Sequence, residues 1–297
     1  MSVVVTARPK SRTFAAANVQ RALGRTALYL IVTFLAALFA LPLFWTVTTS
    51  LKSPTELFVF PPQLLPGAFR IENYPKAWNF VPFGAFYWNT TVVTVLGTFG
   101  AVLSSCLVAY GFARGNFPGR NMLFLVVLST LMLPSEVTII PKFLVFKELG
   151  WLDTLKPLII PDFFGGGAFN IFLLRQFFMT IPRTYDEAAT VDGAGSFRIL
   201  WSILLPLCVP ALITAAILTF LRHWNDFLEP LIYLNSPEML TLSLGLRHFL
   251  LSPSDGGEPK DHLLMAAVLM SAAPCVALFF VAQRYFVRGI VMSGIKG

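Results

Sequence analysis

The sequence has little charge for its length. Only 12% of its 297 residues are Asp, Glu, Lys or Arg, whereas 56% are hydrophobic and the mean hydropathy is +0.71. Soluble domains are about half apolar and about a quarter charged, so this composition indicates a membrane protein. The net charge of +7 does not indicate nucleic acid as a partner, because the basic residues flank apolar runs as they do beside membrane helices.

Several chemical motifs are also absent. The three histidines are scattered and match no metal-binding pattern. No Gly-x-x-x-x-Gly-Lys-Ser/Thr phosphate loop occurs, so the chain is not expected to hydrolyse ATP by that chemistry. We therefore predict no enzyme activity and no catalytic, cofactor-binding or metal-binding residue. The cysteines show neither metal nor disulfide spacing and are interpreted as small packing residues: Cys106, Cys208 and Cys275.

Long apolar runs, in contrast, are abundant. Six of them have about the 20 residues needed to cross the hydrocarbon core of a bilayer: 27–49, 87–112, 122–141, 157–179, 207–233 and 264–283. The first run is too long for a signal peptide and lacks a small-residue cleavage site, so it is interpreted as an uncleaved helix. The sequence thus predicts an all-α, polytopic membrane protein with six transmembrane helices. No internal repeat is found, which disfavours the inverted-repeat architecture of many secondary transporters.

Two of the runs contain residues that interrupt a helix. The third includes Leu133-Pro134-Ser135-Glu136 and then Pro141, which predicts a kink. The fourth contains Gly165-Gly166-Gly167 after Asp162, so its regular helix is expected to start near Ala168. Broken backbone at membrane depth is tolerated only where protein or a water-filled cavity covers it, which favours a bundle with an internal path.

The distribution of charge predicts the orientation in the membrane. Positive residues are retained in the cytoplasm, so both termini are expected there. Thirteen of the 22 basic residues fall on that side: Arg8, Lys10, Arg12, Arg21, Arg25, Arg114, Arg120, Arg175, Arg183, Arg198, Arg284, Arg288 and Lys296. Only three of the 15 acids do: Asp186, Glu187 and Asp192. The predicted segments are a cytoplasmic leader (1–26), a first transmembrane helix (27–49), an extracytoplasmic loop (50–86), a five-helix core (87–285) and a cytoplasmic tail (286–297).

Residues 184–206 form the main polar stretch of the predicted cytoplasmic side. Thr184 and Glu187 have the spacing of a capping box, in which each side chain caps a free amide of the first helical turn. Gly193 suits a left-handed helix stop, and a second short helix is expected from about Ser196 to Pro206. The stretch therefore predicts two short helices joined at a glycine, a compact unit beneath the membrane within a loop spanning 182–206.

The same stretch resembles the EAA motif of ABC importer permeases. Glu187-Ala188-Ala189, three residues, Gly193, nine residues, Ile203, one residue and Leu205-Pro206 match every fixed position of that motif. The small side chains of the two alanines would let another protein approach closely. The resemblance implies that this loop is a coupling helix that docks in a cleft of a cytoplasmic ATPase. The expected coupling residues are Glu187, Ala188, Ala189, Asp192 and Gly193.

Ala109-Tyr110-Gly111-Phe112-Ala113-Arg114 followed by Phe117-Pro118-Gly119-Arg120 looks like the loop after the second span of this family. Three further stretches resemble the MalG-like branch of carbohydrate importers: Met132-Leu133-Pro134, Trp224-Asn225-Asp226-Phe227 and the C-terminal residues 283–289 and 295–297. This resemblance implies a type I ABC importer transmembrane fold in a bacterial or archaeal cytoplasmic membrane. The implied partners are a second homologous permease, two ATP-binding subunits that bind the ATP, an extracytoplasmic solute-binding protein, a carbohydrate and membrane lipid. The tail is expected to reach towards the ATPase pair.

A polar cluster interrupts the fifth apolar run. Ionisable groups at such depth are costly and normally face a cavity or one another. One interpretation is an internal ion pair between Arg222 and Asp226, which are four residues apart on a helix. The other is a lining of the solute path, since Asn amides and a Trp ring suit sugars. The residues concerned are Arg222, His223, Trp224, Asn225 and Asp226, and the resemblance implies only a small contribution of such subunits to sugar contacts.

The leading hypothesis is thus a permease subunit of an ATP-driven carbohydrate importer. The same architecture could carry a glycerol phosphate or a sugar alcohol. A proton-coupled secondary transporter that uses the charges of the fifth run is a more distant alternative. An intramembrane enzyme is disfavoured, because no nucleophile and base stand at a plausible spacing.

Overall fold

The structure, a computed structural model, describes residues 12–253 and 259–294, and this part of the chain contains helices and loops but no strand. The longer helices are α1 (Arg12–Ser50), α3 (Phe83–Arg114), α4 (Arg120–Ser129), α5 (Ser135–Glu148), α7 (Ala168–Thr180), α11 (Val209–Trp224) and α14 (Asp261–Gly294). The short ones are α2 (Asn73–Phe80), α6 (Lys156–Ile159), α8 (Thr184–Val191), α9 (Ser196–Ile199), α10 (Leu205–Leu207), α12 (Leu228–Tyr233) and α13 (Leu242–Leu251). The all-α fold predicted from the apolar runs is confirmed.

Four helical segments of the described chain are long and apolar enough to cross a membrane: Leu23–Ser50, Phe83–Arg114, Lys156–Thr180 and Asp261–Gln283. Two further pairs qualify if each bent pair is one span. They are Arg120–Met132 with Glu136–Glu148, bent by 101°, and Ser196–Leu207 with Val209–Trp224, bent by 82°. The count reaches the predicted six only when each bent pair is one span, and the second pair begins at Ser196, within the stretch expected beneath the membrane.

The third run bends where a kink was predicted, whereas the break in the fifth run was not predicted. The third run turns at Leu133-Pro134, where both residues have extended ψ values of 117° and 138°. The predicted kink is thus a sharp corner between α4 and α5. The fifth run does not continue as one helix to residue 233, because α11 ends at Trp224 and α12 starts only at Leu228.

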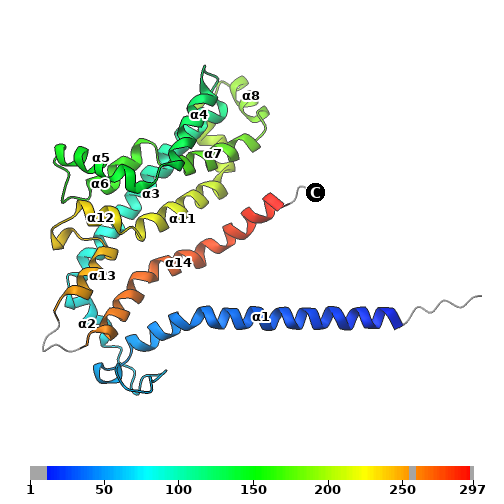
Figure 1. The fold of residues 1–297 in the computed structure, drawn as a ribbon. Helices are drawn as coiled ribbons and strands as arrows, with labels where there is room; N and C mark the ends of the chain where they lie inside the picture. The colour runs from blue at the N-terminus through cyan, green and yellow to red at the C-terminus, as the bar shows by residue number, and fades with distance from the viewer. Residues whose placement is uncertain (1–11, 254–258, 295–297) are drawn as a thin grey trace, which may run out of the picture.

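Helix α3 is the centre of the body, with α7 and α11 packed along it (Figure 1). One cluster of buried side chains lies at the α2 end and includes Phe83, Tyr233 and Phe249. A second cluster lies at the α8 end and includes Leu174 and Leu204. Each end of the bundle thus has its own apolar core, and the polar residues lie between the two cores.

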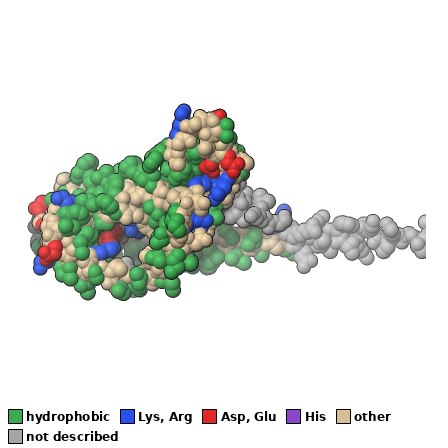
Figure 2. Space-filling view, turned by 90° about the horizontal axis from the view of Figure 1, so that it is seen from above, with side chains coloured by type: hydrophobic (Ala, Val, Ile, Leu, Met, Phe, Trp, Pro, Cys, Tyr) green, Lys and Arg blue, Asp and Glu red, His purple; other side chains and the backbone are tan. Residues whose placement is uncertain are grey.

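Helix α1 leaves this body (Figure 1). Only its C-terminal end lies beside α2 and α14, and its side chains are exposed from residue 23 to residue 45. Charged side chains of the body gather at its two ends, with an apolar band between them (Figure 2). This distribution suits a bundle whose middle lies in hydrocarbon. Arg8, Lys10 and Lys296, which were counted on the cytoplasmic side, and the tail motif at 295–297 lie outside the described residues.

Candidate functional site

The first turn of α8 differs from the predicted capping box. The structure places Arg183 at the N-cap and finds no side-chain cap there; the amide of Glu187 donates to the carbonyl of Arg183 at 3.0 Å. Thr184 is already the first helical residue, so it is one position too far along to act as the cap. The capping-box prediction is therefore wrong, and the helix begins one residue earlier than expected.

The end of α8 follows the prediction closely. Gly193 has a φ of +79°, the left-handed conformation that favours glycine. Its amide donates to Thr190 O at 3.0 Å, and the amide of Ala194 donates to Ala189 O at 2.9 Å, which is the bond pattern of a Schellman motif. The chain then re-enters a helix at Ser196, passes through a π-helical turn (Leu200–Leu204) and continues in α10. The predicted pair of short helices joined at glycine is confirmed.

An ion pair holds α8 against α3. Arg114 Nε lies 3.0 Å from Asp186 Oδ2, and the two side chains are only 10% and 20% exposed. The contact is ionic and lacks the geometry of a hydrogen bond. Arg114 Nη2 also donates to Ile181 O at 2.9 Å, and the Tyr110 hydroxyl donates to Ser196 O at 3.1 Å. The last turn of α3 thus connects both short helices to the bundle. Sequence spacing missed this connection, because Arg114 and Asp186 are distant in the chain.

Of the five expected coupling residues, one is buried against the bundle and four are exposed. Ala189 is 7% exposed and belongs to the apolar cluster beneath α8. The other four are exposed: Glu187, Ala188, Asp192 and Gly193. Beside them Val191 is 88% exposed, and Tyr185 and Phe197 are also exposed. Apolar side chains outside the apolar band mark a surface suited to another protein.

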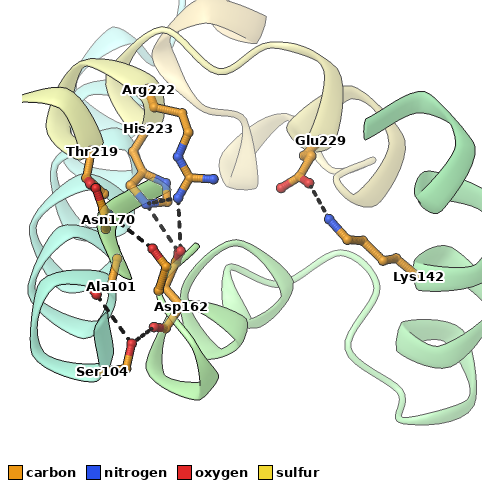
Figure 3. A network of polar contacts seen from close by, with 10 residues as sticks. Ala101, Ser104, Lys142, Asp162, Asn170, Thr219, Arg222, His223 and Glu229 are labelled. Carbon is orange, nitrogen blue, oxygen red and sulfur yellow. Dashed lines mark hydrogen bonds and ion pairs between the residues drawn. The ribbon is translucent and has the colours of Figure 1, made fainter. Parts of the chain in front are cut away.

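A second group of polar side chains lies in the middle of the bundle (Figure 3). Asp162 is on the 3₁₀ segment η3 (Ile160–Phe164) that precedes the glycine run. Its Oδ1 accepts a hydrogen bond from Arg222 Nη2 at 3.0 Å, and its Oδ2 lies 3.2 Å from His223 Nε2. Its backbone carbonyl accepts a hydrogen bond from Ser104 Oγ at 2.7 Å. Asp162 therefore joins α3 and α11 through one carboxylate and one carbonyl.

Glycines allow these elements to approach one another. The fourth run is interrupted as predicted, with Gly165, Gly166 and Gly167 at φ values of +138°, +56° and +92° and α7 beginning at Ala168. A Cβ on Gly97 of α3 would lie 2.8 Å from His223 Nε2. Glycines therefore allow both the break before α7 and the close approach of His223 to α3 at Gly97.

The polar cluster lines a cavity of about 580 Å³, within the range of roughly 300–1,000 Å³ typical of small-molecule sites. On the wall opposite Asp162, Lys142 of α5 and Glu229 of α12 form an ion pair of 3.1 Å (Figure 3). The charged residues that line the cavity are Lys142, Asp162, Arg222, Asp226 and Glu229. A cavity between broken helices with these charged residues beside apolar ones in its lining can hold a hydrated or hydroxyl-rich solute.

Only three of the five residues predicted to line the solute path line the cavity. Arg222, His223 and Asp226 line the cavity. Trp224 is 5% exposed and donates from Nε1 to Ser271 O at 3.0 Å, so its ring is not presented to the cavity. Asn225 is exposed, but its amide donates to the Leu221 carbonyl at 2.8 Å and does not line the cavity.

The alternative ion pair between Arg222 and Asp226 is not formed. Because α11 ends at Trp224, Asp226 is outside the helix and the spacing of four residues does not bring it to the side chain of Arg222. Arg222 pairs with Asp162 instead. Asp226 Oδ1 instead accepts the amide of Glu229 at 3.4 Å, at the start of α12. The sequence singled out Asp162 only because it precedes the glycine run, and this position did not indicate that Arg222 and His223 are its partners.

Helical spans around a polar cavity, with a short helical pair held at one end, define a multi-pass membrane transport component. The family model described as binding-protein-dependent transport system inner membrane component matches residues 101–292, more than half of the chain. The chain belongs to this family of ABC transporter permeases, whose members are inner-membrane proteins and are not themselves enzymes.

Individual relatives agree. The chain is 32% identical over 275 residues to the probable ABC transporter permease protein YurM of Bacillus subtilis, covering 93% of this chain and 90% of that protein. It is 36% identical over 270 residues to the sn-glycerol-3-phosphate transport system permease protein UgpE of Yersinia enterocolitica, covering 89% and 94%. A chain in the crystal structure of a bacterial ABC transporter involved in the import of the acidic polysaccharide alginate aligns with a TM-score of 0.79 at 25% identity, covering 94% of this chain and all of that one.

Proposed function

We propose that the chain is the permease subunit of an ATP-driven carbohydrate importer and that α8 receives the movement produced by a separate ATPase. The observation that carries the proposal is the arrangement of α8: it exposes Glu187, Ala188 and Val191 while Asp186 is bound to Arg114 of α3. An external push on α8 is thereby transmitted to the central helix. The expected partners are a second homologous permease, two ATP-binding subunits and an extracytoplasmic solute-binding protein.

A contiguous set of contacts leads from α8 to the cavity. Arg114 is the last residue of α3, and Ser104 of the same helix binds the carbonyl of Asp162 at 2.7 Å. A shift of α3 along its axis therefore moves the segment that carries Asp162 relative to Arg222. In this mechanism, closure of the ATPases moves α8, and the bundle changes from an inward-facing to an outward-facing state that accepts solute from the binding protein.

The charges of the cavity favour a neutral carbohydrate. Among the described residues that line it, both cationic side chains are already paired, Lys142 with Glu229 and Arg222 with Asp162. Asp226 adds a third carboxylate. An anionic solute would need an unpaired cation, so hydroxyl groups suit this lining better. A glycerol phosphate remains a second candidate because UgpE, which resembles the chain, is a permease protein of sn-glycerol-3-phosphate transport.

The coupling proposal is tested with Val191→Asp, which places a charge on the most exposed apolar side chain of α8. We expect the variant to insert normally but to lose co-purification of the ATPase subunits and solute uptake. Ile71→Asp is the matched control, because Ile71 is likewise exposed but lies just before α2, and α2 is at the opposite end of the body from α8 (Figure 1). Equal ATPase recovery with Val191→Asp and wild type would refute the role of α8.

The substrate class is tested separately in the assembled transporter. Neutral oligosaccharides are expected to compete for uptake, whereas sn-glycerol 3-phosphate is not. Competition by the phosphate ester alone would replace the carbohydrate proposal with the second candidate. Uptake that survives ATP depletion and collapses with the proton gradient would instead favour a proton-coupled transporter.

A further inference from the structure

The termini of three helices lie close together at the α8 end of the body and border a small, open basic cavity. The cavity has a volume of about 240 Å³ and is lined by four arginines: Arg114, Arg120, Arg175 and Arg183. It lies between the end of α3, the start of α4 and the end of α7. This volume is below the roughly 300–1,000 Å³ of most small-molecule pockets, so the cavity suits one compact group.

The positive charge of the cavity exceeds the negative charge beside it. In the described part of the chain, only Arg114 of the four forms an ion pair, with Asp186. Arg120, Arg175 and Arg183 have no acidic partner within that part. Several guanidinium groups around one small space repel each other unless an anion lies between them. The cavity therefore selects an anionic ligand.

Neutral contacts hold two of these arginines in place. The guanidinium of Arg175 lies 4.0 Å from the centre of the Phe124 ring, and its Nε donates to Phe112 O at 3.4 Å. Arg120 Nη1 donates to Gly115 O at 2.9 Å. These contacts orient the side chains without neutralising their charge, and each guanidinium keeps further N–H groups for a ligand. Arginine forks match the oxygens of a phosphate group.

Apolar side chains border the same cavity. Phe112, Met179 and Ile181 line it, and Met179 is exposed. Met122 and Leu123 in the first turn of α4, which begins at Arg120, are exposed as well but do not line the cavity. A free inorganic anion would gain nothing from this apolar border. A ligand with an anionic head and apolar chains would contact both the arginines and the border.

We propose that this four-arginine cavity binds the phosphate group of an anionic phospholipid from the leaflet at the α8 end. Basic pockets between transmembrane helices are known recognition sites for anionic headgroups. Arg114 belongs to both this cavity and the ion pair that holds α8, and Arg183 lies at the start of α8. The lipid therefore lies directly beside the element that we propose receives the ATPase movement.

Native mass spectrometry of the full-length chain tests the proposal, using phosphatidylcholine nanodiscs that contain a minor fraction of phosphatidylglycerol. The wild type is expected to retain phosphatidylglycerol after release from the nanodisc. The double variant Arg120→Gln/Arg175→Gln is expected to bind it about 25-fold more weakly, about fivefold for each charge removed. Arg198→Gln is the matched control, since Arg198 is exposed on α9 and does not line the cavity. Equal retention by wild type and double variant would overturn the proposal.

Two further variants separate binding from folding. Arg183→Gln removes a charge from an exposed side chain, so it leaves the packing intact and is expected to weaken retention about fivefold. Arg175→Lys keeps the charge and is expected to retain the lipid. If the double variant unfolds, unchanged retention in Arg183→Gln decides against the proposal. Displacement of phosphatidylglycerol by inorganic phosphate at equal concentration would assign the cavity to a free anion and overturn the lipid assignment.

Discussion

At Gly166 the backbone leaves no room for a side chain. Its φ is +56°, and a Cβ there would lie 2.0 Å from Ala101 O and 2.1 Å from Ser105 Oγ. Gly166→Ala combines left-handed strain with a clash against the backbone of α3, and we expect it to destabilise the protein by about 3 kcal/mol or more. A lower melting temperature in detergent, accompanied by loss of uptake, is the measurement that checks this expectation.

Gly111 provides the matched control on the same central helix. A Cβ at this position would have no neighbour within 4 Å. Gly111→Ala is therefore expected to be neutral or to stabilise α3 by roughly 0.5–1 kcal/mol, because alanine loses less backbone entropy in a helix. Similar melting temperatures for the two variants would show that the close contact at Gly166 is not required.

Local backbone properties were predictable from the sequence at this scale, whereas partners were not. The positive φ of Gly193 and the interruption before Ala168 follow from glycine itself. The capping box failed because the chain enters the helical conformation at Arg183, one residue before Thr184. The ion pair of Arg222 was expected at a helical spacing, but its partner Asp162 is 60 residues away and no spacing rule connects them.

At the scale of elements, the ion pair between Arg114 and Asp186 is the connection to test. Arg114→Asp or Asp186→Arg alone places like charges together in a mostly buried position and is expected to cost roughly 1.5–3 kcal/mol. The double exchange restores opposite charges but not the hydrogen bond to Ile181 O, so we expect partial recovery. Melting temperature and ATPase co-purification are the two measurements.

An exposed pair provides the control for this exchange. Arg70 and Glu72 form an ion pair of 3.2 Å with side chains that are 45% and 52% exposed. Exchanging these two residues is expected to change stability by less than about 1 kcal/mol. If both single changes at Arg114 and Asp186 are as mild as this exchange, α8 does not depend on α3 for its position.

The elements themselves were predictable in number but not in path. The six apolar runs correspond to four helices long enough to span a membrane and two bent pairs in the described chain, because hydropathy measures how much apolar length is present. The corner at Leu133-Pro134 lies where proline predicted a kink, but neither its angle of 101° nor the end of α11 at Trp224 could be derived from hydropathy. Trp224 illustrates the limit: its residue type suited a sugar-binding face, but its ring stacks on Phe220 at 5.5 Å inside the core.

At the scale of the whole molecule, most of α1 has no packing partner within the described part of this chain. Its residues from Leu28 to Phe44 are exposed and, except for Thr33, apolar, and within the described chain only its end contacts the body. The sequence predicted a membrane span here, and the structure agrees with its length. Where α1 lies around the assembled transporter depends on neighbours that the sequence of one subunit does not describe.

The orientation of the whole molecule is predicted from charge alone and can be measured directly. Arg114, Arg120, Arg175 and Arg183 line one cavity at the α8 end, and positively charged residues are retained in the cytoplasm. In a background without the native cysteines, we expect Ile71→Cys to react with a membrane-impermeant thiol reagent added to intact cells. Arg183→Cys, which is similarly exposed, is expected to react only after the membrane is opened. The reverse labelling would place α8 outside, where no cytoplasmic ATPase could reach it, and would contradict both the orientation and the proposed coupling.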